Sequence, residues 1–144
     1  MPDNSHVYES MFLISQAEAA DLNGIIAHVE EILRRGDAEI LAMRKWDERR
    51  LAYEIDKQRR GLYILCYFRA PASSIAHIER DCNLSERIMR TMLLRADHLT
   101  EEEVASQEDR TGLATEAKLR AARATERVAR ETEPEEAGEP AAAE

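Results

Sequence analysis

Apolar residues recur with a helical period in some segments of the chain and cluster as strands in others. Residues 7–15 contain a run of four large apolar residues, which is typical of a buried strand. Residues 22–33 carry six apolar residues at offsets 0, 3, 4, 7, 10 and 11, which form one stripe of an amphipathic helix. Ser15 and Asp21 are candidate N-terminal caps, and Gly36 suits a C-terminal cap.

A long second strand is predicted over residues 39–55. Its apolar positions, which include Leu41 and Met43, share one parity and define one face. Three charged residues interrupt this face midway, which predicts a bulge or a projecting stem. The interrupting residues are Lys45, Asp47 and Arg49. The polar segment 56–61 ends in glycine and is predicted to be a hairpin loop that leads to a central strand over residues 62–69.

Pro71 ends the central strand and can open a second helix, whose buried side is predicted to carry Ile75, Ile78 and Cys82. Residues 88–95 form the last predicted strand. The resulting order, βαββαβ, is that of the ferredoxin-like α+β fold. We therefore expect a four-stranded antiparallel sheet with two helices on one face, which leaves the other face for a partner.

Charge is unevenly distributed along the chain. The 144 residues hold 20 Lys or Arg and 29 Asp or Glu, a net charge of −9, which on its face argues against a nucleic-acid partner. Residues 1–100 account for only −2 of this charge, and residues 101–144 account for −7. Residues 34–69, with ten basic and six acidic side chains, form a basic centre of +4. The total charge therefore says little about any one binding surface.

Residues 101–144 also differ from the rest of the chain in composition. They include no aromatic residue, and their large apolar residues are only Val104, Leu113, Leu119 and Val128. So few apolar side chains are expected to bury too little surface for a core. Residues 115–130 have the composition of a helix that packs against no core. The end of the chain is expected to be disordered. We therefore divide the chain into a domain over residues 1–100 and an acidic tail over residues 101–144, helical in part or disordered.

Residue types that usually carry catalysis do not gather in this sequence. The four histidines lie on separate predicted elements and lack metal-ligand spacing. Cys66 and Cys82 fall at apolar positions, where they are expected to be small core residues. The five glycines are too widely separated for a phosphate-binding loop. We therefore expect no catalytic residues, no metal site and no cofactor, and we do not predict an enzyme.

Targeting signals are not evident in the sequence. No segment approaches the roughly 18 apolar residues of a membrane span. The first five residues are not a basic region that leads into an apolar one, so a secretory signal is not predicted either. We expect the protein to stay in the cytosol.

The basic centre carries the most specific chemistry. Its candidate RNA-binding cations are Arg44, Lys45, Arg49, Arg50, Lys57, Arg59 and Arg60. They surround Trp46, the single tryptophan, whose ring can stack on a base or on a guanidinium group. One interpretation is a hairpin that contacts RNA phosphates. The other is a charged strand edge that prevents aggregation, next to a polar loop, with several cations paired internally. Composition leaves both interpretations open.

A motif in the same region resembles a known family. Residues 49–57 (RRLAYEIDK), followed by residues 61–63 (GLY), resemble the signature of the sixth protein of the bacterial small ribosomal subunit. The resemblance extends from residues 7–10 to residues 90–95, so it covers the first hundred residues or so and excludes the acidic tail. The motif is more specific than the fold, which hosts many functions.

The resemblance implies a structural, non-enzymatic constituent of the small subunit in the cytoplasm. Such a protein binds small-subunit (16S) rRNA in the platform, as a heterodimer with the eighteenth small-subunit protein. The resemblance makes Arg49 and Arg50, together with Arg44 and Lys45, candidates for phosphate contacts, and it adds Arg90 in the last strand. The partner protein is expected to cover exposed sheet near Trp46 and Tyr63.

Two residues depart from the pattern of that family. Glu48 stands where the family usually has glycine, and Asp56 stands where it usually has a basic or small residue. Both add negative charge beside the expected RNA surface, where they are expected to weaken phosphate contacts or to pair with Arg49 and Lys57.

Two other functions suit the predicted fold. A ferredoxin-like regulatory domain would form a homodimer through its sheet and bind a small metabolite. An enzyme of the acylphosphatase type shares the fold as well, but its anion-cradling loop is missing from this sequence.

Overall fold

The computed structural model describes residues 4–55 and 57–132, and it confirms the predicted order of strands and helices. The strands are β1 (Ser5–Ser15), β2 (Glu39–Ile55), β3 (Gln58–Pro71) and β4 (Arg90–Arg95). The helices are α1 (Gln16–Ala19), α2 (Leu22–Arg35), the 3-10 turn η1 (Ala72–Ser74), α3 (Ile75–Leu84), α4 (Glu101–Ala105) and α5 (Arg110–Thr132). None of the described helices is long and apolar enough to cross a membrane.

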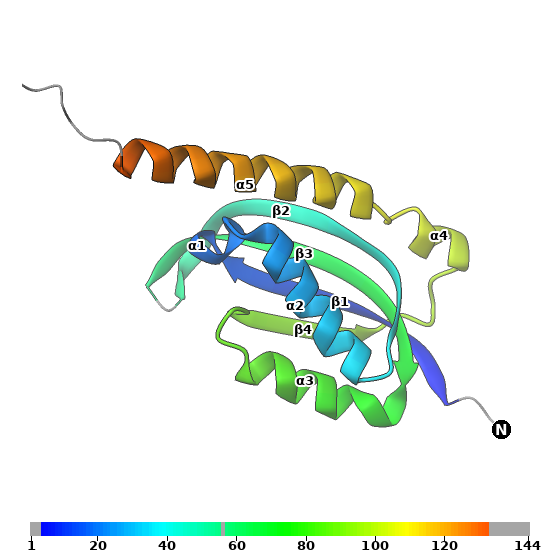
Figure 1. Ribbon diagram of the computed structural model, residues 1–144. Helices are drawn as coiled ribbons and strands as arrows, with labels where there is room; N and C mark the ends of the chain where they lie inside the picture. The colour runs from blue at the N-terminus through cyan, green and yellow to red at the C-terminus, as the bar shows by residue number, and fades with distance from the viewer. Residues whose placement is uncertain (1–3, 56, 133–144) are drawn as a thin grey trace, which may run out of the picture.

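The four strands form one antiparallel sheet in the order β2-β3-β1-β4. Helices α2 and α3 lie on one face of this sheet, as Figure 1 shows. The expected ferredoxin-like α+β fold is therefore confirmed. Strands β2 and β4 are the two edges of the sheet, and the β2–β3 hairpin extends beyond α1, α2 and α3 at one end of the molecule (Figure 1).

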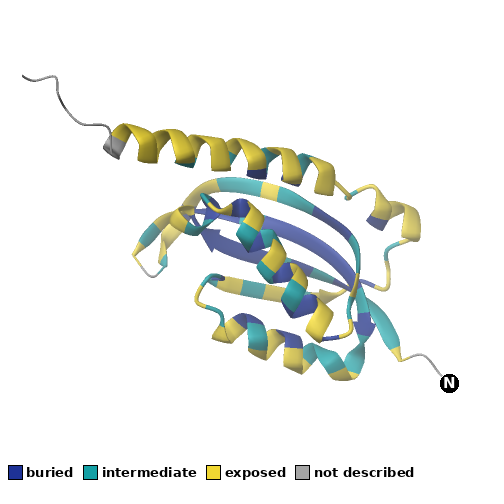
Figure 2. Ribbon diagram, in the orientation of Figure 1, coloured by how far each residue is buried: buried dark blue, intermediate teal, exposed yellow. Residues whose placement is uncertain are grey.

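The main core lies between the sheet and the two helices. Figure 2 shows buried strands beneath the exposed outer face of α2. Five of the six residues in the predicted apolar stripe of α2 are buried, and the sixth, Ile26, packs against the same core. From the sheet, alternate residues of β1 and β3 enter this core, among them Phe12, Ile14, Ile64 and Phe68. The apolar residues that alternate along the strands thus pack against the apolar stripe of the helix in one layer.

Capping side chains fix where the first helices begin. The Ser15 hydroxyl accepts a hydrogen bond from the backbone N–H of Glu18 at 3.1 Å, and the Asp21 carboxylate accepts one from Gly24 at 3.3 Å. Gly36 is the C-terminal cap of α2. All three predicted caps are confirmed. The Ser15 and Asp21 side chains pair with backbone N–H groups that the helix itself leaves unpaired, and Gly36 ends α2.

Strand β2 contains the predicted irregularity, but one consequence was not foreseen. Its register with β3 shifts between Lys45 and Asp47, and also between Ile40 and Ala42. Because of the second shift, Leu41 packs on the sheet face away from α2, whereas Met43 is buried in the main core. The prediction that Leu41 and Met43 share a face was therefore wrong, because a bulge reverses strand parity.

The hairpin between β2 and β3 is tighter than predicted. Ile55 pairs with Gln58 beside the turn, after an irregularity in the register between Arg50 and Ile55, and residues 58–61 belong to β3 rather than to a loop. Lys57 takes the left-handed backbone conformation, with φ of 65°. Asp56 lies outside the described residues. Arg59 and Arg60 thus belong to a strand, so their side chains lie on opposite faces of the hairpin.

The segment after Thr100 is packed against the body, contrary to expectation. Helix α5 runs along β2 (Figure 1), and its residues Leu113 and Ala117 are buried in the main core. Val104 of α4 is buried in a second cluster on the other sheet face. The expectation of no core was wrong for this part of the segment, although the predicted helix over residues 115–130 is confirmed. The domain boundary at Thr100 stays a prediction, and residues 133–144 lie outside the described residues.

Candidate nucleic-acid interface

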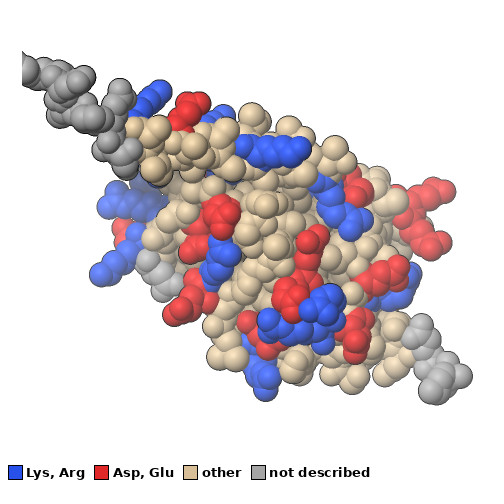
Figure 3. Space-filling view, in the orientation of Figure 1, with Lys and Arg blue, Asp and Glu red and all other residues tan. Residues whose placement is uncertain are grey.

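Five predicted RNA-binding cations lie on the outer part of the β2–β3 hairpin. They are Arg49, Arg50, Lys57, Arg59 and Arg60, and all five are exposed. Figure 3 shows blue side chains projecting at the end of the molecule where Figure 1 places this hairpin. We call these five residues the hairpin cations. The fold therefore gathers them at one projecting end.

Two hairpin cations face each other directly. The register of β2 and β3 places Arg50 opposite Arg60. Like charges at opposed positions destabilise an antiparallel pair. Neither arginine forms an ion pair with any residue that the structure describes. An anion bound between the two guanidinium groups would remove their repulsion, so this pair suits a phosphate group.

The other hairpin cations are only weakly neutralised. Arg59 pairs with Glu54 at 3.1 Å, and both side chains are more than half exposed. Arg49 lies 3.8 Å from the Asp47 carboxylate, again between exposed side chains. Exposed pairs of this kind contribute about 0–1 kcal/mol and exchange readily with other ions. They do not remove the positive character of the hairpin.

An aromatic pair lies beside Arg49. Trp46 and Tyr63 meet edge to face with 5.5 Å between their ring centroids. The Arg49 guanidinium lies 4.9 Å from the Trp46 ring and 5.7 Å from the Tyr63 ring. Such contacts hold a guanidinium group in place without neutralising its charge. The two residues predicted to bind a partner protein are therefore brought together, on the sheet face opposite α2.

Lys45 is not grouped with the hairpin cations. Its amine donates to Glu116 of α5 at 3.0 Å and to Glu48 at 3.5 Å. Arg120 joins the same cluster, because its guanidinium donates to Glu48 and to Glu116 at 2.6 Å each. Burial opposes the ionisation of Glu116, but the hydrogen bonds from Arg120 and Lys45 outweigh it and keep the pKa of that carboxyl below its ordinary value. We call these four residues the anchor network, since they join β2 to α5.

The anchor network also explains Glu48, one of the two departures from the family pattern. Its carboxylate faces Arg120 and Lys45 rather than Arg49. Its negative charge is therefore compensated within the protein. Arg44 is engaged by the same segment, because its guanidinium donates to Gln107 at 3.1 Å.

Arg90 lies in a hollow on the sheet face away from α2 and α3. This hollow of about 310 Å³ is also lined by Tyr63 and by Tyr53, Ile55 and Met92. Arg90 is exposed, and it shares this hollow with Tyr53 and Ile55 of the hairpin.

Several exposed apolar residues on this face were missed by sequence reasoning. Tyr53 is 67% exposed, and Met92 and Leu94 of β4 are about half exposed, at 45% and 50%. The alternation within β4 was the available signal, because Met92 and Leu94 share a parity and Leu93 turns toward the main core.

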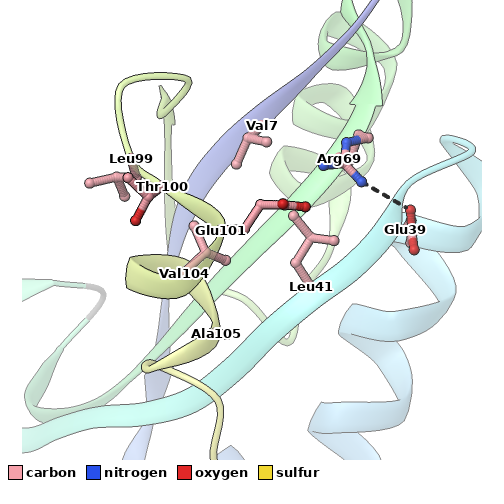
Figure 4. A pocket seen from close by; sticks show the side chains of 9 residues that line it. All are labelled: Val7, Glu39, Leu41, Arg69, Leu99, Thr100, Glu101, Val104 and Ala105. Carbon is pink, nitrogen blue, oxygen red and sulfur yellow. Dashed lines mark hydrogen bonds and ion pairs between the residues drawn. The ribbon is translucent and has the colours of Figure 1, made fainter.

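A second hollow lies between α4 and the far end of the sheet. Figure 4 shows its lining, with Val104 beside Leu41 and with the Arg69–Glu39 ion pair, whose atoms lie 3.5 Å apart, at its rim. The lining is mixed, and two of its three charged residues, Arg69 and Glu39, pair with each other. This hollow lies away from the hairpin cations.

Residues of the types used in catalysis are buried or dispersed. Burial raises the pKa of the Cys66 thiol to about 12 and that of Cys82 to about 11, so neither is a thiolate at neutral pH. Both cysteines are buried, as predicted for small core residues. Within the part of the chain that the structure describes, no three His, Cys, Asp or Glu side chains are placed to hold a metal ion.

Known proteins resemble this chain over the sheet and its two helices. The family model for ribosomal protein S6 matches residues 7–95. Small ribosomal subunit protein bS6 of Desulforamulus reducens is 32% identical over 89 residues, which cover 61% of this chain and 94% of that protein. The bS6 protein of Protochlamydia amoebophila is 34% identical over 97 residues, 67% of this chain and 85% of that protein. The bS6 protein of Rhodopirellula baltica is 31% identical over 93 residues, 64% of this chain and 66% of that protein.

A solved structure agrees with these matches. The crystal structure of 30S ribosomal protein S6 from Thermotoga maritima superposes with a TM-score of 0.59 at 27% identity, covering 72% of this chain and 99% of that one. These relatives are named as ribosomal proteins, not as enzymes. Because the family model matches more than half of the chain, the protein belongs to the ribosomal protein S6 family, and it is a small-subunit ribosomal protein of the bacterial cytoplasm.

Proposed function

We propose that this protein binds 16S rRNA in the platform of the small subunit, as a heterodimer with the eighteenth small-subunit protein, and that its role is structural. Family membership supports this proposal, and so does the separation of two surfaces on the molecule. The hairpin cations offer positive charge at one end. The sheet face away from α2 offers aromatic and apolar side chains.

The single observation that carries RNA binding is the opposed pair of Arg50 and Arg60. Facing arginines without an ion pair repel each other, and a bound anion would relieve that repulsion. Arg49, Lys57 and Arg59 flank the pair and extend the positive surface along the hairpin. Their role is to neutralise phosphates and to fix the register of the protein on the RNA, with little reading of bases. Arg90 continues this surface across the sheet face.

Arg44 and Lys45 have a different place in the proposal. Both are half-buried, and both are already engaged by residues of the segment after Thr100. We assign them to holding that segment, and we assign RNA contact to the hairpin cations and Arg90.

The partner surface is proposed around Trp46 and Tyr63. Large aromatic residues are enriched among the side chains that carry binding energy at protein interfaces. Trp46 is 42% exposed, and the exposed Tyr53 and Met92 continue the same face toward β4. A partner seated there would cover the apolar side chains that this chain leaves in water.

The test is binding to a platform fragment of 16S rRNA, with and without the eighteenth protein. The variant Arg49→Glu/Arg50→Glu is expected to lose at least about tenfold in affinity, and the slope of log K against log salt is expected to fall by about 2. The matched control is Arg34→Glu/Arg35→Glu, which reverses two exposed charges at the end of α2. Affinity that does not change in the hairpin variant, or that does not depend on salt, contradicts the proposed surface.

A further inference from the structure

Helix α5 is a basic helix within a segment that is acidic on average. Residues 110–132 hold six Lys or Arg and three Glu, a net charge of +3. The residues on either side, 101–109 and 133–144, each carry a net charge of −5. The positive charge is therefore confined to the helix. This segment lies outside the residues that the family model matches.

Five of the nine charged residues of α5 form one stripe along the helix. Glu116, Arg120, Arg123, Arg127 and Arg130 follow one another at alternating spacings of four and three residues, which places them on one face. The first two belong to the anchor network and are neutralised there. Within the described residues, the last three are exposed or partly exposed and form no ion pair. The stripe thus divides into a part that attaches the helix and a part that remains positive.

Core packing does not account for the positive part. Ala117 is the last buried residue of α5, and the helix continues to Thr132. Figure 3 shows blue side chains along this helix, which extends over the same end of the molecule as the β2–β3 hairpin (Figure 1). The helix therefore carries its exposed arginines to the end where the hairpin cations lie.

A groove lies beside the stripe. It lies between α1 and α5, has a volume of about 230 Å³, and is lined by three arginines of the stripe together with Gln16, Ala20 and Ala124. The arginines are Arg120, Arg123 and Arg127. Arg120 also donates to the backbone carbonyl of Ala19 at 3.5 Å, which joins α5 to the end of α1. Arg120 is neutralised by Glu48 and Glu116, so the free positive charge of the groove comes from Arg123 and Arg127.

The chemistry of the surface favours nucleic acid over a membrane. A membrane-surface helix needs a broad apolar face beside its basic one. Here the large exposed apolar residues of α5 are only Leu119 and Val128. The stripe from Arg123 to Arg130 spans about 10 Å at 1.5 Å per residue. A nucleic-acid strand carries about three phosphates over that length, so three arginines match it.

We infer that the exposed arginines of α5, Arg123, Arg127 and Arg130, form a second phosphate-binding surface for small-subunit rRNA, which extends the interface of the hairpin cations beyond the family domain. This inference rests on the proposed RNA-binding function and adds a site to it. The anchor network has a matching role, because it fixes the helix in the position from which these arginines reach the RNA.

The test uses the full chain, the eighteenth protein and the platform fragment of 16S rRNA. The variant Arg123→Gln/Arg127→Gln/Arg130→Gln keeps residues that favour helix. Its affinity is expected to fall about tenfold, and its salt slope by about 2 to 3. The matched control, Arg34→Gln/Arg35→Gln/Arg80→Gln, removes the same charge from exposed positions on α2 and α3 and is expected to bind as the unchanged protein does. Circular dichroism checks that all variants keep their helix content.

A second variant separates charge from structure. Replacing the same three arginines with lysine keeps the charge and is expected to keep the affinity, because phosphate neutralisation needs only a cation. A lysine variant as weak as the glutamine variant overturns the inference.

The remaining outcomes also distinguish the proposals. Unchanged binding by the α5 glutamine variant, together with weaker binding by Arg49→Glu/Arg50→Glu, overturns this inference and leaves the proposed function standing. Failure of the unchanged protein to bind the RNA overturns both. Loss of the eighteenth protein with RNA affinity retained assigns α5 to protein binding and overturns the RNA surface.

Discussion

Replacing Leu113 with alanine tests whether α5 is part of the core. Leu113 is 2% exposed and belongs to the main cluster with Ala117. Burying a leucine side chain contributes about 1.5–3 kcal/mol, and Leu→Ala in protein cores costs about 2–5 kcal/mol because a cavity remains. Leu113 belongs to α5, which packs along the edge strand β2 rather than over the centre of the sheet. We therefore expect a loss near the lower end, about 2–3 kcal/mol.

Leu119→Ala is the control for this experiment. Leu119 is on the same helix and is 53% exposed, so the same chemical change removes little buried surface. We expect a loss below about 0.5 kcal/mol. The helix propensity difference is identical in the two variants, which leaves burial as the difference between them.

Urea unfolding followed by circular dichroism measures both variants. With an m value of about 1–3 kcal/mol per M, a loss of 2 kcal/mol lowers the midpoint by roughly 0.7–2 M. If α5 detaches before the sheet unfolds, m falls as well, because the main transition then exposes less surface. Equal midpoints for Leu113→Ala and Leu119→Ala would refute the packing of α5 described above.

Two further predictions concern titrating groups. The backbone N–H of Val7 and the guanidinium of Arg95 lower the pKa of the Asp97 carboxyl from 3.8 to about 2. The unfolded chain takes up this proton first, so the stability that Asp97 contributes is complete above about pH 4 and is lost as the pH falls to 2. In acid unfolding followed by tryptophan fluorescence, the difference in stability between Asp97→Asn and the unchanged protein should shrink over that range; a constant difference would contradict this account. Burial raises the pKa of Cys66 to about 12 and that of Cys82 to about 11, so neither should react with a thiol reagent at pH 8 until the protein unfolds. Rapid labelling of the folded protein, measured by mass spectrometry, would contradict that burial.

Much of the fold could be predicted from the sequence because its signals are local. The stripe of α2 begins beside Asp21 and ends beside Gly36, so periodicity and capping agree on the same helix. The β2 bulge was predicted from charged residues that interrupt an apolar face, and it was found there. A second bulge near Leu41 carries no such signal, because residues on both sides of it are apolar. The face of the sheet on which Leu41 lies was therefore predicted wrongly from the alternation of residues.

The packing of α5 could not be predicted, because it depends on contacts far apart in the chain. Leu113 and Ala117 alone are too few to indicate a buried face. The charges that hold the helix lie in β2, at Lys45 and Glu48, and nothing in the sequence near α5 indicates them. The same contacts divide the predicted RNA-binding set. They occupy Lys45 and leave Arg49 exposed, although both lie in one strand.

The segment after Thr100 also limits where a partner can bind. Strand β2 is an edge of the sheet, and an exposed edge invites pairing with another strand. Here the backbone N–H of Met43 donates to Glu108 at 3.0 Å, and its carbonyl accepts from the N–H of Asp109 at 2.9 Å. Both groups that an added strand would use at this position are satisfied. A partner strand therefore cannot pair with β2 there, which leaves the open sheet face, the β4 edge and the hairpin as the surfaces of the sheet that a partner can reach.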